Sequence, residues 1–144
     1  MFRDTFETRF TYLNGFLRNV SRFGSRPALF DPRSGRRWTY RELNAEANRL
    51  AHALRADGVG KNDVVMFTLL NSPEFVFCYL AAHKIGAIAC PVNYRQGAGE
   101  IALVIDDSTP KAFIYDAEFG ELSGGALDLC ESKPAIKIVV GADD

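Results

Sequence analysis

The segment from Gly97 to Ala102 has the pattern G-x-G-x-x-A, which is typical of loops that bind the pyrophosphate of a dinucleotide. It follows an apolar stretch that predicts a strand, and it opens a stretch that predicts a helix. Asp116 follows the next predicted strand, where a carboxylate would hold a ribose hydroxyl. Backbone N–H groups at the helix N-terminus would then bind the phosphates.

Two features of the same segment favour a purely structural role. Residues 94–96 separate the first glycine from the predicted strand end, whereas a phosphate loop begins almost directly at that end. Glu100 would also place a carboxylate near the helix N-terminus, where it would repel a phosphate. Glycines that relax a loop before a helix are the preferred interpretation, and nucleotide binding by this segment stays an alternative.

The cysteines and histidines form no readable ligand set. Cys78, Cys90 and Cys130 lack the close pairing of zinc sites, and His52 and His83 do not complete a set. The thiols are therefore predicted to be small buried side chains of the core. His83 is interpreted as a structural residue near a helix end.

The remaining polar residues indicate no catalytic machinery. Asp106 and Asp107 form an acidic pair, but their place before Ser108 at a predicted helix end favours a solvated turn. The sequence contains no G-x-x-x-x-G-K-[ST] or G-x-S-x-G motif and no Ser/His/Asp set with readable spacing. We therefore assign no catalytic, cofactor-binding or metal-binding residue.

Composition limits the class of protein. The 144 residues are 47% apolar, 24% charged and 12% aromatic, which predicts a packed globular core. The net charge of −1 argues against a nucleic-acid surface. The longest apolar run is too short to span a membrane, and residues 1–10 lack the apolar stretch of a signal peptide. A cytoplasmic location is expected.

The first predicted element is a helix over residues 5–23 that lies on the surface of the domain. Its apolar side chains recur in steps of four and three along one stripe. The stripe contains Phe6, Phe10, Leu13, Leu17 and Val20. An arginine-bearing aromatic helix of this kind is also compatible with a membrane-surface anchor, but Asp4 and Glu7 argue against that alternative.

A hairpin and a second helix come next. Residues 28–30 and 36–39 flank turn-forming residues and predict the two hairpin strands. Thr39 and Glu42 then form a capping box, and Gly58 ends the helix that this box begins. The apolar face of that helix is predicted to contain Leu43, Ala47, Leu50, Ala51 and Leu54.

Residues 64–93 predict a strand, a helix and a second strand. Residues 64–70 are an almost continuous apolar run, which is typical of a strand buried on both faces. Ser72 and Pro73 suit the N-cap and first position of a helix, and Gly86 suits its left-handed end. The predicted inward face of this helix contains Phe75, Val76, Tyr79, Leu80 and His83.

The rest of the chain continues the alternation. Helices are predicted up to about residue 107 and over 119–129, where Gly124 and Gly125 interrupt the pattern, and strands over 111–115 and 136–140. The fold class is therefore α/β: a three-layer unit with a mostly parallel sheet flanked by helices, plus an N-terminal helix and a β-hairpin. We expect the N-terminal helix within 1–26 and the α/β unit within 27–144.

Several motifs in a fixed order resemble the start of an AMP-forming acyl-CoA synthetase, of the fatty-acid–CoA ligase type in the adenylate-forming superfamily. Residues 38–43 (WTYREL) are similar to the family's [ST]-Y-x-E-L, and residues 84–93 (KIGAIACPVN) to its K-x-G-A-x-x-x-P-[VLI]-[ND]. Between them lie residues 48–51 (NRLA), 58–65 (GVGKNDVV) and 71–75 (NSPEF). The resemblance extends over nearly the whole chain from Pro27.

This resemblance implies a function for a larger protein. The family activates a carboxylic acid with ATP to an acyl-adenylate, using Mg²⁺, and transfers the acyl group to coenzyme A. Its phosphate loop, adenosine-binding residues and catalytic lysine lie downstream of the part that this chain resembles, so the chain alone is expected to bind no cofactor and to be inactive. Fatty or aromatic acids are the implied substrates, and the rest of the synthetase is the implied partner.

Two alternatives from other classes stay open. One is a nucleotide-binding module that uses Gly97 to Ala102. The other is an interaction or structural domain, because a part of a larger enzyme exposes apolar surface where its partner packs. The second alternative predicts self-association of the isolated chain into a homo-oligomer.

Overall fold

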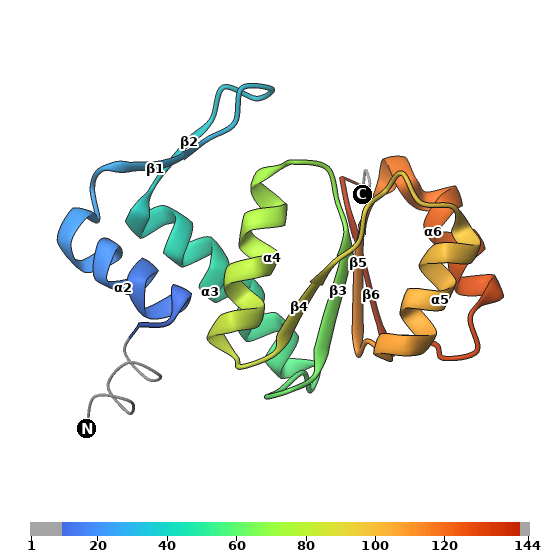
Figure 1. Cartoon of the computed structure of the whole chain (residues 1–144). Helices are drawn as coiled ribbons and strands as arrows, with labels where there is room; N and C mark the ends of the chain where they lie inside the picture. Colours follow the sequence, from blue (N-terminus) through green and yellow to red (C-terminus); the bar gives the residue numbers. More distant parts are fainter. Residues whose placement is uncertain (1–9, 142–144) are drawn as a thin grey trace.

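The computed structural model describes residues 10–141. Its helices are α2 (Tyr12–Phe23), α3 (Tyr40–Ala56), α4 (Pro73–Lys84), α5 (Ala98–Ser108) and α6 (Gly120–Leu129), and a 3-10 turn, η1, covers Ala117–Phe119. Its strands are β1 (Pro27–Phe30), β2 (Arg37–Thr39), β3 (Val64–Thr68), β4 (Ile88–Pro91), β5 (Ala112–Asp116) and β6 (Ile136–Val140). Figure 1 shows these elements in chain order.

The predicted three-layer α/β unit is confirmed. Within the described residues, four parallel strands form one sheet in the order β4-β3-β5-β6, and β1 pairs with β2 as an antiparallel hairpin. Helices α3 and α4 cover one face of the sheet, and α5 and α6 cover the other (Figure 1). Such a sheet is buried on both faces, which explains the continuous apolar run that begins at Val64.

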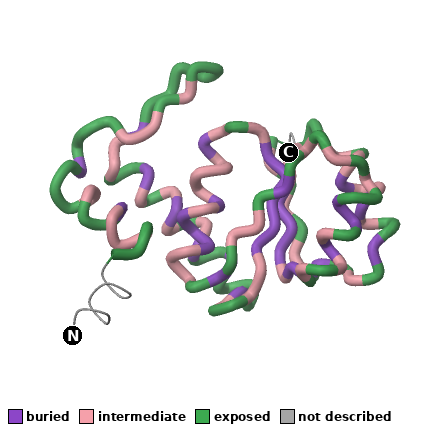
Figure 2. Tube along the Cα trace, in the orientation of Figure 1, coloured by how far each residue is buried: buried purple, intermediate pink, exposed green. Residues whose placement is uncertain are grey.

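Alternate residues of the central strands fill two separate cores. Phe67 and its neighbours on one face pack against α3 and α4, and Met66 and Phe113 on the other face pack against α5 and α6. Figure 2 shows the central strands as the most continuously buried part of the chain. The period of two along a strand thus assigns each side chain to one core or the other.

A third core joins the N-terminal elements to the sheet unit. Phe16 of α2 and Trp38 of β2 are buried with Leu43 of α3 and Leu80 of α4. The hairpin and α2 are therefore packed on the α3 and α4 layer, and Figure 1 shows the hairpin projecting beyond it.

The predicted stripe of the N-terminal helix is wrong in part: Val20 packs against the third core, but Phe10 and Leu17 do not. The helix begins at Tyr12 with Thr11 as its N-cap, and its buried residue is Phe16, which the stripe omits. Phe10 precedes the helix and is 62% exposed, and Leu17 is 39% exposed. Periodicity alone gives several faces of similar apolar content, and the contact with Trp38 selects the one that contains Phe16. Phe6, Asp4 and Glu7 lie outside the described residues.

The predicted caps are largely confirmed. Thr39 Oγ1 accepts a hydrogen bond of 3.2 Å from the Glu42 N–H, and Glu42 Oε2 accepts one of 2.8 Å from the Thr39 N–H. The hydrogen bond from the Thr39 N–H, and then the one from the Thr39 hydroxyl, lower the pKa of the Glu42 carboxyl. Gly86 ends α4 with φ of 73°, as the left-handed position requires. Ser72 occupies the N-cap of α4, but its side chain makes no capping hydrogen bond.

Two predictions for the later helices need correction. The face of α4 that packs on the sheet contains Cys78, Ala81 and Ala82, so small side chains allow the helix to lie close to β3. Phe75 and Tyr79 are only partly buried, at the border of that core. Helix α6 runs unbroken through Gly124 and Gly125, because its packing against α5 outweighs the low helix propensity of glycine.

Candidate functional site

Parallel α/β sheets bind ligands at the carboxyl edge, which is the edge where the carboxyl ends of the strands lie. The ligand binds between two neighbouring strands whose following connections run to opposite faces of the sheet. Here that point lies between β3 and β5: α4 follows β3 onto one face, and α6 follows β5 onto the other. Asp116 ends β5 at this point, and its Oδ2 accepts a hydrogen bond of 2.7 Å from the Leu70 N–H. The carboxylate thus holds the loop after β3 in place.

The loops after β4 and β5 also meet at this edge. The ring of Tyr94 stacks on Phe119 of η1, with centroids 4.8 Å apart and planes 7° apart. The Arg95 guanidinium carbon lies 5.9 Å from the centroid of the Tyr94 ring in the same loop. This edge therefore carries one carboxylate and an aromatic stack, both already engaged with other parts of the chain.

In the segment from Gly97 to Ala102, a carboxylate of the segment itself occupies the position where an anion would bind. Gly97 is the N-cap of α5, and its N–H donates a hydrogen bond of 2.8 Å to Glu100 Oε2. A carboxylate therefore lies where a phosphate would bind the helix N-terminus. Asp116 is engaged with Leu70 and does not complete a ribose-binding pair. This geometry favours the structural interpretation of the glycines over nucleotide binding.

The three thiols are unsuited to nucleophilic chemistry. Cys78 and Cys130 are buried as predicted, whereas Cys90 is half-buried. Burial, reinforced by the charges of Glu74 and Asp116, raises the pKa of Cys78 to about 12. Burial also raises the pKa of Cys90.

The acidic and histidine side chains do not converge on a metal site. Within residues 10–141, no three His, Cys, Asp or Glu side chains lie close enough together to hold a metal ion. Asp106 and Asp107 belong to the last turn of α5 rather than to the following turn, and Asp106 accepts a hydrogen bond of 2.7 Å from the Ser132 N–H. The acidic pair is thus partly structural.

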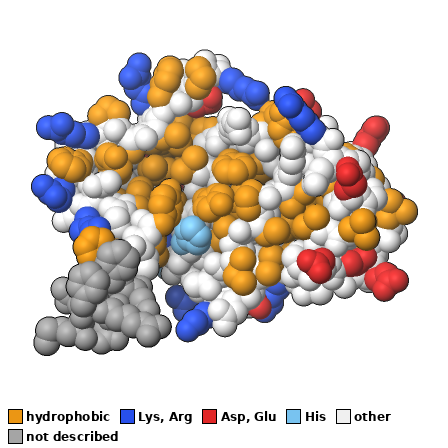
Figure 3. All heavy atoms as spheres, in the orientation of Figure 1, with side chains coloured by type: hydrophobic (Ala, Val, Ile, Leu, Met, Phe, Trp, Pro, Cys, Tyr) orange, Lys and Arg blue, Asp and Glu red, His pale blue; other side chains and the backbone are white. Residues whose placement is uncertain are grey.

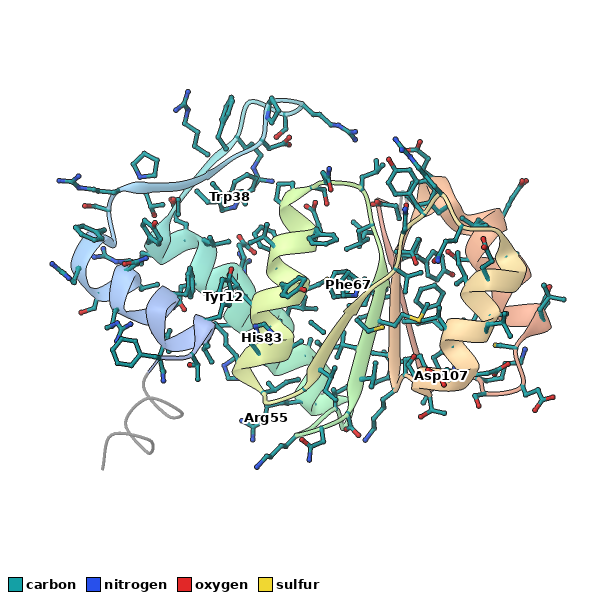
Figure 4. All side chains as sticks on the ribbon, viewed as in Figure 1. Tyr12, Trp38, Arg55, Phe67, His83 and Asp107 are labelled. Atoms are coloured by element: carbon teal, nitrogen blue, oxygen red, sulfur yellow. The ribbon has the colours of Figure 1, made fainter. Side chains whose placement is uncertain are left out.

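His83 belongs to an aromatic cluster on the open side of α4. Its ring lies edge-on to Tyr12 of α2 and to Tyr79, with centroids 5.7 and 5.4 Å away (Figure 4). Tyr79 in turn packs against Phe67 and Phe75. The structural role predicted for His83 fits this arrangement, because its ring packs against two aromatic side chains.

A large pocket adjoins this cluster. It has a volume of about 530 Å³ and lies between α2, the hairpin, α3 and α4. A second hollow of about 270 Å³ shares Tyr12 and Val76 with it and is completed by Phe75, Tyr79 and His83. We call the two together the α4 groove. Figure 3 shows hydrophobic side chains gathered on this face of the molecule, and Figure 4 labels Tyr12 and His83 in the same orientation.

The α4 groove was not predicted from the sequence. The sequence analysis placed Phe75, Val76 and Tyr79 on one apolar face of α4. The helix is also apolar on a second side, where Cys78 and Ala81 are buried against the sheet, and this wide apolar surface was the signal that could have indicated the groove. A helix apolar on more than one side packs against more than one neighbour.

Comparison with known proteins identifies the family. Residues 16–144 match the AMP-binding enzyme family. The chain is 42% identical over 106 residues to the 3-hydroxybenzoate–CoA/4-hydroxybenzoate–CoA ligase of Thauera aromatica, covering 74% of this chain and 20% of that protein. It is 41% identical over 116 residues to the long-chain-fatty-acid–CoA ligase FadD13 of Mycobacterium tuberculosis, covering 81% and 23%.

The structural comparison agrees with these relatives. The solved structure of a Mycobacterium tuberculosis fatty acyl CoA synthetase matches with a TM-score of 0.80 at 31% identity, covering 87% of this chain and 25% of that one. The chain thus spans about a fifth to a quarter of the length of these three proteins. The motifs, the fold and the relatives agree that the chain belongs to the family of AMP-binding enzymes.

Proposed function

We propose that this chain is the N-terminal subdomain of an acid–CoA ligase that works in the cytoplasm. In the proposed reaction a carboxylate attacks the α-phosphorus of ATP, forming an acyl-adenylate and releasing pyrophosphate. The thiol of coenzyme A then displaces AMP and forms the thioester. The observation that carries the proposal is the match to the fatty acyl CoA synthetase over 87% of this chain at a TM-score of 0.80.

The described residues do not themselves fit ATP or Mg²⁺. The N-terminus of α5 is occupied by Glu100, and no metal-binding group is present in residues 10–141. We therefore assign ATP, Mg²⁺ and coenzyme A to the whole ligase and derive no catalytic step from these side chains. The proposed contribution of this chain is to hold the carboxyl edge of β3 and β5 in a fixed shape through the Asp116 to Leu70 hydrogen bond.

The α4 groove supports the proposal that more of the ligase packs on this chain. Its lining is apolar and aromatic, and exposed apolar surface of this kind marks an interaction site. The rest of the ligase chain is the proposed occupant, because the relatives are four to five times longer than the part matched here. The helix within 1–26 and the α/β unit within 27–144 would then form one subdomain of the larger protein.

The proposed acid is a fatty or an aromatic acid. The identities to the hydroxybenzoate ligase and to the long-chain-fatty-acid ligase are nearly equal, 42% and 41%, so they do not discriminate between the two classes. We do not propose the α4 groove as the binding site of the acid, because several of its residues belong to the core that joins α2 and the hairpin to α3 and α4.

A segment exchange tests the proposal. Residues 16–144 would replace the matching segment of FadD13, and the hybrid would be assayed for formation of long-chain acyl-CoA from ATP and coenzyme A. We expect the hybrid to be active, whereas the 144-residue chain alone forms no acyl-adenylate. A hybrid that also carries Asp116→Ala should lose activity, while one that carries Asp128→Ala on the exposed side of α6 should keep it.

Two results would contradict the proposal. A hybrid that folds and binds ATP but forms no acyl-adenylate would show that this scaffold does not serve the reaction. Acyl-adenylate formation by the isolated 144-residue chain would show that the catalytic residues lie within it.

A further inference from the structure

A pocket lies between α2, the second half of α3 and the end of α4. It has a volume of about 290 Å³ and shares no lining residue with either hollow of the α4 groove. Because α3 ends before β3 begins and α4 ends before β4 begins, the pocket is near the edge of the sheet opposite to Asp116. It is therefore separate from the candidate functional site.

The polar side of this pocket carries basic side chains. Arg55 of α3 and Lys84 of α4 supply two cations, and Asn48 and His52 of α3 supply further nitrogen donors. None of the residues that line the pocket is acidic. We call it the basic pocket, and its polar side favours a negatively charged ligand.

Neither cation of the basic pocket has a carboxylate partner. No ion pair within residues 10–141 includes Arg55 or Lys84. Lys84 Nζ instead donates a hydrogen bond of 2.7 Å to Asn44 Oδ1 and lies 5.8 Å from the centroid of the Phe16 ring. Burial lowers the pKa of Lys84, because a charged group loses hydration there. An anion in the pocket would offset that loss.

The rest of the pocket lining is apolar. Leu13 and Leu17 of α2, Ala51 of α3 and Ile85 at the C-cap of α4 supply it. Leu17 is 39% exposed, so an apolar ligand group would cover surface that water contacts. These residues do not belong to a membrane span, since none of the helices in residues 10–141 has the length and apolar content that crossing a membrane requires. The lining thus suits an anion with an apolar tail.

The positions of Arg55 and Lys84 also have a simpler explanation. Each lies in the last turn of its helix, where a cation stabilises the negative end of the helix dipole. However, the terminal carbonyl groups already have partners: those of residues 53–55 accept from the N–H groups of 57–59, and those of 81–83 from 85–87. Neither side chain is needed to cap its helix, and the dipole does not explain why both cations line one pocket with an apolar side.

We propose that the basic pocket binds a small monocarboxylic acid in its ionised form. Arg55 and Lys84 hold the carboxylate, for which a planar guanidinium offers two parallel hydrogen bonds, and the apolar tail packs on Leu13 and Leu17. The volume is at the lower end of the range for ligand pockets, so the tail is short. The bound acid joins α2 to the ends of α3 and α4. This second site goes beyond the proposed ligase reaction and is tested by binding alone.

A titration with sodium hexanoate, followed by amide chemical shifts of the 15N-labelled 144-residue chain, tests the proposal. The chain is kept dilute enough to be monomeric. We expect saturable shifts at Asn48, His52 and Ile85. Neither 1-hexanol, which lacks the charge, nor sodium acetate, which lacks the tail, should come within about tenfold of the hexanoate affinity.

Three results of these titrations would overturn the proposal. One is the absence of saturable shifts with hexanoate. Another is a set of shifts confined to the α4 groove, at Val76 and Tyr79, which would place the acid in the other hollow. The third is tighter binding of hexyl phosphate than of hexanoate, which would assign the pocket to phosphate esters.

A charge-neutralising variant locates the carboxylate. Arg55→Gln should lower the affinity for hexanoate by about tenfold, because a charge-assisted hydrogen bond is lost. The matched control is Arg49→Gln, which removes the same charge from the same helix at a side chain that is 72% exposed and lies outside the pocket lining. It should bind hexanoate normally. Equal loss in both variants would assign the effect to net charge and contradict the site.

A second variant locates the apolar tail. Leu17→Asn keeps every charge but removes part of the apolar lining, so the affinity for hexanoate should fall about fivefold while that for acetate stays unchanged. Leu103→Asn, at a position 70% exposed on α5, is the control and should bind hexanoate normally. Unchanged hexanoate binding by Leu17→Asn would show that the tail does not enter the pocket, and the proposal would be wrong. Circular dichroism verifies that each variant is folded.

Discussion

Lys111 Nζ lies 3.1 Å from Asp63 Oδ2 and 2.6 Å from the carbonyl oxygen of Gly58. The lysine, at the start of β5, thereby joins the end of α3 to the loop before β3. Asp63 also accepts a hydrogen bond of 2.8 Å from the Gly60 N–H. These contacts lie at the edge of the sheet opposite to Asp116, so they bear on stability rather than on the candidate site.

The stabilising effect of Asp63 should depend on pH. The Gly60 hydrogen bond, and then that of Lys111, lower the pKa of Asp63 below its ordinary value of 3.8. The charged form is favoured in the folded state, so its contribution is complete above the unfolded pKa and is lost as pH falls through the folded pKa. Asp63→Asn should lower the melting temperature at neutral pH, and its difference from the natural chain should shrink below about pH 3.8. A difference that stays constant down to pH 2 would contradict this, measured by circular dichroism.

Phe67→Ala should destabilise the fold strongly. The Phe67 ring is fully buried on β3 and lies edge-on to Phe75 and Tyr79, with centroids 5.1 and 5.7 Å away. Removing it leaves a cavity in the core and should lower the free energy of unfolding by about 3 to 5 kcal/mol. Leu103→Ala, at a position 70% exposed on α5, is the control and should change it by less than about 0.5 kcal/mol. Urea denaturation measures both, and similar losses would mean that Phe67 is not a core residue.

The parts of the fold that were predictable have local causes. The capping box of Thr39 and Glu42, the left-handed Gly86 and the apolar run from Val64 each specify structure through neighbouring residues. The inward face of α2 was not predictable, because Phe16 is selected by Trp38, a residue far along the chain. Where periodicity gives a helix several faces of equal apolar content, long-range packing decides which of them is buried.

In the candidate site, too, the features with local causes were predictable and those that depend on long-range contacts were not. From its position alone, Glu100 was predicted to place a carboxylate at the helix N-terminus and so to disfavour phosphate binding. In the structure its carboxylate accepts a hydrogen bond from the Gly97 N–H at that helix N-terminus. The partner of Asp116 was not predictable: Leu70 lies 46 residues earlier and meets it only through the parallel pairing of β3 and β5. The α4 groove likewise forms between elements distant in sequence.

Asp116→Ala should destabilise the carboxyl edge of the sheet. Its Oδ2 accepts a partly buried hydrogen bond of 2.7 Å from the Leu70 N–H, so the variant leaves that donor without its acceptor. The expected loss is about 2 kcal/mol, as for a hydrogen bond to a charged group. Asp116→Asn keeps an acceptor oxygen and should lose less, and Asp128→Ala on the exposed side of α6 should be neutral. Equal denaturation midpoints for the Ala and Asn variants would show that the hydrogen bond contributes little.

Thiol labelling should distinguish the three cysteines. Cys78 is buried with its pKa raised to about 12, and Cys130 is buried and donates to the carbonyl oxygens of Leu127 and Ser132. Only the half-buried Cys90 is expected to react with a disulfide reagent in the folded chain, and slowly, because burial raises its pKa as well. All three should react in denaturant. Persistent labelling of a folded Cys90→Ser variant would show that another thiol is accessible.

The isolated chain should self-associate through the α4 groove, because nothing within residues 10–141 covers its aromatic lining. Tyr12→Glu places a charge at the mouth of the groove, on a side chain that is 64% exposed and thus tolerates the change without unfolding. Leu129→Glu makes the same substitution at a 63% exposed position at the far end of α6 and serves as the control. In sedimentation velocity, the natural chain and Leu129→Glu should grow in apparent mass with concentration, while Tyr12→Glu stays monomeric. A natural chain that is monomeric at high concentration would mean that the groove is too small to hold a second copy, and association by all three proteins would place the contact elsewhere.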